Sequence, residues 1–152
     1  KYLNLKSKKI YLSTGMSTID EIKKSLKYLT NPEVVIMHCV SEYPLPYQNA
    51  NLMAIKELKK KFPSYEIGYS DHTIGILACK LAVSLGATTI EKHFTMDKNL
   101  EGTDHIISAD PNDLKLLISE IQKIKTLLGN EKKKPTTKEY KIREFVRNRF
   151  KI

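Results

Sequence analysis

Residues 68–105 read GYSDHTIGILACKLAVSLGATTIEKHFTMDKNLEGTDH. This stretch contains short apolar runs that end in polar clusters, Ser-Asp-His after the first and Glu-Lys-His after the last. Three of the four histidines of the chain lie within it. A strand, a helix and a second strand fit this alternation, so the stretch predicts a βαβ unit with chemically active residues at its strand ends.

The rest of the chain continues this alternation of strands and helices. Strands are predicted at short apolar, β-branched runs, and helices where apolar residues recur at helical spacing. The predicted strands are residues 10–13, 34–40, 66–70 and 88–92, and the predicted helices are residues 17–30, 52–62, 75–85 and 111–128. Four strand–helix units in this order argue for a parallel α/β sheet with right-handed crossovers.

Capping residues predict where the first and last of these helices begin and end. Ser17 and Asp20 have the three-residue spacing of a capping box, and Asn31-Pro32 is expected to stop the first helix. Asp110 is the predicted N-cap of the last helix, since Pro111 suits the first helical position.

Residues able to do chemistry collect where the predicted strands end. They occur in pairs two residues apart, and such pairs point to the same side of an extended chain. The pairs are Ser41 and Tyr43, Ser70 and His72, and Glu91 and His93, with Ser13 alone after the first strand. A doubly wound sheet and half of an eight-unit barrel both fit the order of elements. Converging strand ends favour a (β/α)8 TIM barrel, of which this chain would supply four units.

The histidines and carboxylates of this rim predict a divalent-metal site. Imidazole and carboxylate ligands with open positions suit Mn, Fe, Co or Zn better than a calcium cage. A histidine at a strand end is also commonly a hydrogen-bonded structural residue, and that alternative stays open for His72 and His93. Asp71 either orients His72 or caps the loop.

Composition excludes several classes of protein. The chain has 152 residues, of which 41% are hydrophobic and 28% charged, as in globular proteins. No apolar run approaches the roughly 20 residues that span a bilayer, so we expect no membrane partner. Cys39 and Cys79 lie in apolar settings without metal-type spacing, which predicts buried, reduced thiols in a cytoplasmic protein.

The net charge of +9 is concentrated toward the carboxyl terminus, from Lys123 onward. A basic segment of this kind can bind nucleic acid through its phosphates. It can equally be a solvated helix face followed by a linker, as most charge runs are. No aromatic residues interleave the lysines before Lys134, so we expect no nucleic-acid partner.

Five segments carry a resemblance to a known family. They are STGMST (13–18), HCVSEYPLPY (38–47), GYSDHTIG (68–75), IEKHFTMD (90–97) and GTDHIIS (102–108). In this order they resemble the second half of the sialic acid (N-acetylneuraminate) synthase family, whose relatives make legionaminic and pseudaminic acids. The resemblance implies that residues 1–129 are strands five to eight of a catalytic barrel. It implies that residues 130–152 are a basic linker toward a small antifreeze-like domain absent from this chain.

The family resemblance also implies a reaction and a role for each motif residue. The implied transferase condenses phosphoenolpyruvate (PEP) with N-acetylmannosamine or a related N-acetylated amino sugar and releases phosphate, in a homodimeric enzyme. Divalent metal, most often Mn²⁺ with Mg²⁺ or Co²⁺ as alternatives, is implied at His72 and His93. The implied PEP-binding residues are Ser13, Ser41 and Ser70, and the implied residues at the sugar are Tyr43, Glu91 and Asp104.

The chain departs from the family pattern in two ways. Some members have asparagine at the position of Ser41, and the first four strands of the family barrel have no counterpart here. The chain alone is therefore expected to be inactive and to associate through its open sheet edges. Two other functions stay open: another barrel enzyme, such as a lyase, with a histidine-bound metal, and a non-catalytic basic binding module.

Overall fold

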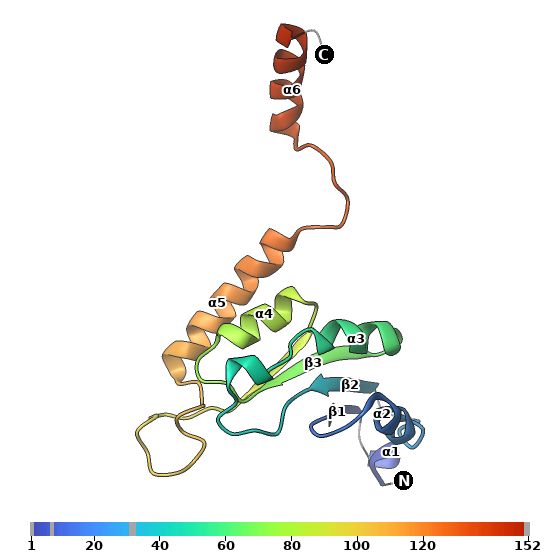
Figure 1. Cartoon of the computed structure of the whole chain (residues 1–152), viewed down its shortest axis with the longest axis vertical. Helices are drawn as coiled ribbons and strands as arrows, with labels where there is room; N and C mark the ends of the chain where they lie inside the picture. The colour runs from blue at the N-terminus through green and yellow to red at the C-terminus, as the bar shows by residue number, and fades with distance from the viewer. Residues whose placement is uncertain (1, 7, 31–32, 151–152) are drawn as a thin grey trace.

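A computed structural model describes residues 2–6, 8–30 and 33–150 (Figure 1). The strands are β1 (Lys9–Ser13), β2 (Glu33–His38), β3 (Glu66–Asp71) and β4 (Thr89–Lys92). The helices are α1 (Tyr2–Lys6), α2 (Ile19–Leu26), α3 (Ala54–Lys61), α4 (Leu77–Ser84), α5 (Pro111–Leu128) and α6 (Thr137–Phe150), with a short 3-10 helix at Tyr47–Asn49. The predicted alternation of strands and helices is confirmed.

The four strands form one parallel sheet in the order β1-β2-β3-β4. A doubly wound sheet reverses its strand order at a switch point, whereas this order runs in one direction as in a barrel. The sheet curls as it twists, with α3 and α4 on its outer side (Figure 1). The prediction of half a (β/α)8 barrel is therefore confirmed.

The hydrophobic core lies on one face of the sheet, between the strands and the helices that follow them. Alternate strand residues point to this face, where they meet the apolar sides of α2, α3 and α4. Its members are Ile22, Leu26, Val34, Ile36, Ile55, Leu58, Phe62, Ile67, Tyr69, Ala78, Ala82 and Ala87. Helices confined to one face are the arrangement of a barrel wall, because a doubly wound sheet carries helices on both faces.

The opposite face of the sheet is the one that would line the inside of a barrel. On this face, Met37 of β2 is the register partner of Gly68 in β3. A Cβ at residue 68 would lie 2.3 Å from the Met37 sulfur and 3.0 Å from the Thr89 carbonyl oxygen. Glycine at this position therefore lets the buried Met37 side chain lie across β3.

Most predicted boundaries differ from those of the structure by one or two residues, and the end of the first helix differs by four. The N-cap of α2 is Thr18 rather than Ser17, because the Glu21 carboxylate accepts from the Thr18 backbone N–H at 2.7 Å and completes the capping box. Strand β2 ends at His38 rather than at residue 40. The predicted stop at 31–32 lies outside the described residues, and α2 ends at Leu26. The Asp110 cap and Pro111 start of α5 are confirmed.

The carboxyl-terminal segment leaves the sheet. Helix α6 stands apart from the other elements at the end of an extended connection (Figure 1), and none of its described residues is buried. Whether residues 130–152 lead to a further domain stays a prediction. Within the described ranges, we find no helix long and apolar enough to span a bilayer.

Candidate functional site

The two predicted metal ligands come together at the carboxyl ends of neighbouring strands. His72 directly follows β3 and His93 directly follows β4, and the strands are paired in register up to Asp71 and Lys92. The two imidazole rings lie edge to face with their centroids 5.6 Å apart. The parallel sheet therefore brings together side chains that are 21 residues apart in sequence.

Tyr43 completes an aromatic cluster with the two histidines. Its ring centroid lies 3.9 Å from that of His72 and 6.0 Å from that of His93. The loop that carries Tyr43 is tied to β3, because the Leu45 N–H donates to the His72 carbonyl oxygen at 2.9 Å. Partial burial raises the pKa of the Tyr43 phenol, and nearby Cys39, Asp104 and Glu91 raise it further. The phenol is therefore a neutral hydrogen-bond donor at physiological pH.

The His72 ring is buried and held at one nitrogen. Its Nδ1 lies 2.7 Å from the carbonyl oxygen of Val40, which can only accept a hydrogen bond. Nδ1 must then carry a hydrogen, so in the neutral ring Nε2 is the nitrogen with the free lone pair. A backbone carbonyl that fixes the tautomer in this way is the usual support of a metal-binding histidine.

Asp104 reaches the cluster from the long loop after β4. The loop returns to the sheet edge, where the Ala109 N–H donates to the His93 carbonyl oxygen at 2.7 Å and Phe94 forms a parallel bridge with Ala109. The Asp104 carboxylate lies 3.8 Å from His93 Nδ1, an ion-pair separation when His93 is protonated. Asp104, His93 and Tyr43 all remain partly exposed, so this side of the cluster is open to a ligand.

Ser70 and Glu91 lie one step back along the same two strands. They are register partners, and the Ser70 hydroxyl donates to Glu91 Oε1 at 2.6 Å. The bond orients the carboxylate across the interior face of the sheet. It also occupies the only hydrogen of the Ser70 hydroxyl.

The structure places Ser13 and Ser41 apart from this group. Ser13 ends β1, and β2 lies between β1 and β3. Ser41 lies beside Gly15, so closely that a Cβ at residue 15 would be 2.3 Å from its hydroxyl oxygen. The three serines predicted to bind PEP are therefore divided: Ser13 ends β1 and Ser41 follows β2, whereas Ser70 lies in β3 beside Glu91.

The Asp71 carboxylate does not bond the His72 ring, whose Nδ1 bonds Val40. It accepts from the Thr73 N–H and so caps the loop, one of the two predicted alternatives. Asp71 lies on the opposite face of the sheet, fully buried, and its carboxylate pairs with the Lys92 ammonium at 2.9 Å. Sequence reasoning missed Lys92 altogether. The two-residue period of a strand could have found it, because residues next to His72 and His93 must point to the core face.

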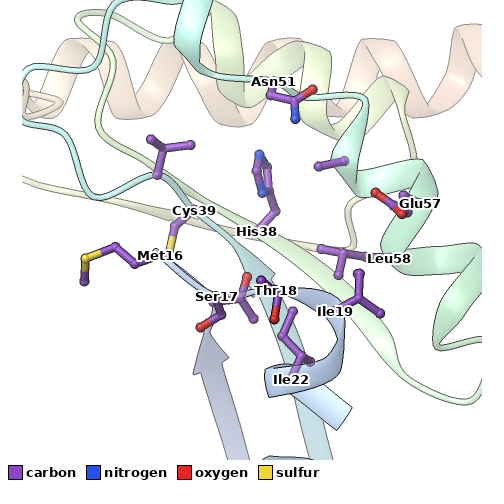
Figure 2. A pocket seen from close by; sticks show the side chains of 13 residues that line it. Met16, Ser17, Thr18, Ile19, Ile22, His38, Cys39, Asn51, Glu57 and Leu58 are labelled. Carbon is purple, nitrogen blue, oxygen red and sulfur yellow. The ribbon is translucent and has the colours of Figure 1, made fainter.

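The two other histidines are held elsewhere. His105 Nδ1 lies 2.8 Å from the Thr95 hydroxyl within the long loop. His38 points into a cavity of about 370 Å³ between the loop after β1 and α3 (Figure 2). Its Nε2 lies 3.0 Å from the Ala50 carbonyl oxygen, and burial lowers the pKa of its ring. Neither histidine belongs to the Tyr43 cluster.

His72 and His93 fit a divalent cation as a pair of ligands. The free Nε2 of His72 and the 5.6 Å ring separation suit two imidazoles that share one ion. In the part of the chain that the structure describes, no three His, Cys, Asp or Glu side chains gather closely enough to hold a metal. Further ligands would have to be water, substrate or groups outside this chain.

Comparisons with known proteins agree with this arrangement. Residues 1–133 match the model of the NeuB family. The chain is 44% identical over 145 residues to the N,N'-diacetyllegionaminic acid synthase of Legionella pneumophila, covering 91% of this chain and 40% of that protein. It is 38% identical over 142 residues to the pseudaminic acid synthase of Campylobacter jejuni, covering 91% of this chain and 41% of that one.

A solved structure shows the same fold. The N-acetylneuraminic acid synthetase of Leptospira borgpetersenii superposes with a TM-score of 0.82 at 42% identity, covering 91% of this chain and 48% of that one. The chain spans about 40% of the length of the Legionella pneumophila and Campylobacter jejuni synthases. A model match over most of its residues, similar relatives and a shared half-barrel lead to one conclusion: this chain belongs to the NeuB family.

Proposed function

We propose that this chain forms the second half of the catalytic barrel of a nonulosonic acid synthase. The enzyme would condense PEP with N-acetylmannosamine or a related N-acetylated amino sugar and release phosphate. The observation that carries the proposal is the meeting of Tyr43, His72, His93 and Asp104 at one strand-end rim. Active sites of (β/α)8 barrels lie at this end of the strands.

The proposed reaction is a transfer of the PEP carbon skeleton to an aldehyde. C3 of PEP forms a bond to the aldehyde carbon of the open-chain sugar, whose oxygen takes up a proton. Water adds to the electron-poor C2 and loses a proton. The bond between C2 and the phosphate oxygen then breaks, and inorganic phosphate leaves as the new keto group forms. No external oxidant or reductant is required.

The two histidines would hold the divalent cation for this chemistry. His72 would contribute Nε2, because its Nδ1 proton is held by the Val40 carbonyl. His93 would contribute the nitrogen that faces away from Asp104. A bound cation such as Mn²⁺, Mg²⁺ or Co²⁺ would supply Lewis-acid polarisation of the sugar aldehyde.

The polar groups around the histidines would orient the sugar. Tyr43 offers a neutral phenol as a donor, and Glu91 and Asp104 offer carboxylates that suit sugar hydroxyl and amide groups. Ser70 donates to Glu91 in the present arrangement. It must release this bond before it can donate to a PEP oxygen, so its contribution to PEP binding is coupled to the position of Glu91.

Ser13 and Ser41 would contact PEP from the adjoining part of the rim. Neutral hydroxyls are weaker partners for phosphate than charged groups. We therefore propose that cationic groups from the first half of the barrel carry most of the phosphate binding, and that these serines fix its orientation. The chain alone would bind PEP weakly for the same reason.

A diacetamido sugar is the substrate that we favour within this class. The chain is 44% and 43% identical to two N,N'-diacetyllegionaminic acid synthases, compared with 38% to a pseudaminic acid synthase and 37% to an N-acetylneuraminate-9-phosphate synthase. The differences are modest, so the choice must be made by assay.

Product analysis tests the proposed function. The intact enzyme that carries this chain would be incubated with PEP, Mn²⁺ and either N-acetylmannosamine or a diacetamido hexose. Mass spectrometry should then show a product equal to the sugar plus PEP plus water minus phosphoric acid. If no N-acetylated hexose yields that mass while PEP is left intact, the proposal is wrong. Cleavage of a carbon–carbon bond in a sugar acid, without PEP, would instead support a barrel lyase.

A further inference from the structure

Directly behind the two histidines, on the opposite face of the sheet, lies a buried ion pair. Asp71 is the residue before His72, and Lys92 is the residue before His93. Successive strand residues point to opposite faces, so when the histidines face the rim these two residues must face the core. They are register partners, and their charged groups lie 2.9 Å apart with 0% and 5% of the side chains exposed.

The pair holds the backbone on both sides of His72. The Lys92 ammonium donates to the Asp71 carboxylate and also to the carbonyl oxygen of Thr73. The Thr73 N–H in turn donates to Asp71 Oδ1 at 2.9 Å. The residues before and after His72 are therefore both bonded to one network, whose cation belongs to the strand that continues into His93.

The remaining hydrogen-bonding capacity of Asp71 is also used. The Tyr69 hydroxyl donates to Oδ1 at 3.0 Å, and the Cys79 thiol of α4 donates to Oδ2 at 3.2 Å. Burial, reinforced by the Asp71 carboxylate, raises the pKa of both donors, so both keep their protons. Four donors on one carboxylate fix its position relative to two strands and one helix.

A contribution to the free energy of unfolding is a poor explanation for the Asp71–Lys92 ion pair. Removing two charges from water costs about as much as their attraction returns, and apolar replacements of buried pairs are often neutral or stabilising. An apolar pair makes no directional bonds, whereas this salt bridge and its additional hydrogen bonds fix the positions of groups on two strand ends relative to each other.

We propose that Asp71 and Lys92 are positioning residues that set the separation of the His72 and His93 rings from the far side of the sheet. The expected effect on metal binding rests on the proposed function. The expected effect on the ring positions does not, since these positions can be measured without metal or substrate.

A neutral double variant, Asp71→Asn/Lys92→Met, tests the proposal in the full chain. Nuclear Overhauser contacts between the Tyr43, His72 and His93 rings report their positions, and calorimetric titration with Mn²⁺ reports affinity. We expect the contacts between the His72 and His93 rings to disappear and the dissociation constant for Mn²⁺ to rise about 10-fold or more. Asp71→Asn/Lys92→Gln, which keeps polar groups, serves the same comparison if the first variant does not fold.

Two controls separate positioning from general stability. Ile67→Val removes a buried methyl group from the same face of β3 and should lower the melting temperature without moving the rings. Lys80→Met/Glu120→Gln removes an equal pair of charges that joins α4 to α5 at 3.9 Å. Both controls should keep wild-type ring contacts and Mn²⁺ affinity.

The outcomes distinguish this proposal from the proposed function. Intact ring contacts and unchanged Mn²⁺ affinity in the double variant would overturn the positioning role and leave the metal site standing. Lost contacts in a protein whose wild type binds no Mn²⁺ would support positioning and remove the metal role. If the ring contacts are also lost in the Ile67→Val control, general destabilisation explains the loss. Asp71 and Lys92 would then be ordinary structural residues.

Discussion

His72 Nδ1 lies 2.7 Å from the carbonyl oxygen of Val40, so the orientation of the ring depends on the segment that leaves β2. Because a carbonyl cannot donate, Nδ1 must carry a hydrogen, and the neutral ring is the Nδ1–H tautomer. Nitrogen-15 spectra of histidine-labelled protein should show this tautomer for His72 at pH 7.5. Added Mn²⁺, whose paramagnetic broadening weakens steeply with distance, should broaden the His72 and His93 signals more strongly than that of His105. Stronger broadening of His105 would place the ion in the long loop instead.

Ser70→Ala should impair the enzyme through Glu91. The substitution removes the 2.6 Å hydrogen bond that orients the Glu91 carboxylate, and a bond to a charged group is worth about 1.5–3 kcal/mol. We expect turnover of the intact enzyme to fall about 10-fold or more. Ser84→Ala is the matched control, since its hydroxyl bonds only the Lys80 carbonyl on the exposed side of α4. Equal activity of the two variants would show that Ser70 does not orient a working carboxylate.

Gly68→Ala should destabilise the sheet. The added methyl group would lie 2.3 Å from the Met37 sulfur and 3.0 Å from a backbone oxygen of β4. Overpacking of this kind costs about 1–3 kcal/mol, which denaturant unfolding can measure. Gly68→Ala/Met37→Val should recover part of the loss, because the sulfur contact is removed while the backbone contact remains. No recovery would assign the whole cost to the backbone.

The free energy of unfolding should decrease as the pH falls, because the His38 ring is buried in its neutral form. Burial lowers the pKa of its ring below the ordinary value of about 6.5, so the folded protein favours the neutral form. The unfolded chain then binds more protons between the two pKa values, and this contribution is full above pH 6.5 and lost as the pH falls toward the folded pKa. Melting temperatures measured from pH 7.5 to 5.5 should decline.

His38→Gln provides the comparison for this pH dependence. The glutamine amide can still donate to the Ala50 carbonyl but does not titrate. The variant should show a shallower decline between pH 7.5 and 5.5. An equally steep decline would assign the effect to other groups. Carboxylates with lowered pKa values, such as Glu21 and Asp110, act in a more acidic range and do not confuse this window.

The features predicted correctly from the sequence are those that neighbouring residues determine. The Asp110 cap followed by Pro111 and the alternation of strands with helices are set by neighbouring residues, and both were predicted correctly. The meeting of His72 with His93 followed from strand ends sharing one edge of a parallel sheet. The first capping box was misplaced by one residue, because Ser17-Asp20 and Thr18-Glu21 have equal spacing and Glu21 reaches the cap backbone better.

The partner of a buried charge is harder to predict than its face of the sheet. The two-residue period of a strand places Lys92 on the core face, but only the pairing of β3 with β4 shows that its partner is Asp71. Burial is equally hard to predict in α5, whose apolar residues recur at helical spacing although Leu117 alone is buried among its described residues. Burial depends on what covers a face, and that information lies outside the local sequence.

The open edges of the half-barrel predict association of the chain when it is alone. In the described sheet, β1 pairs only with β2 and β4 pairs only with β3, so each leaves one strand edge unpaired at the sheet's ends. Unpaired edges are templates for further strands. Light scattering should report more than one copy per particle. A monodisperse monomer that unfolds cooperatively would contradict this expectation.

Phosphate release from PEP by the intact enzyme, compared with its His93→Gln variant, tests most directly whether this rim is one wall of a synthase site. We expect release only when an N-acetylated amino sugar and a divalent cation are both present. We also expect a loss of at least about 100-fold in His93→Gln, since the second shell alone is worth 10–100-fold. Wild-type release of phosphate from the folded variant would contradict the claim that this rim is one wall of a synthase site.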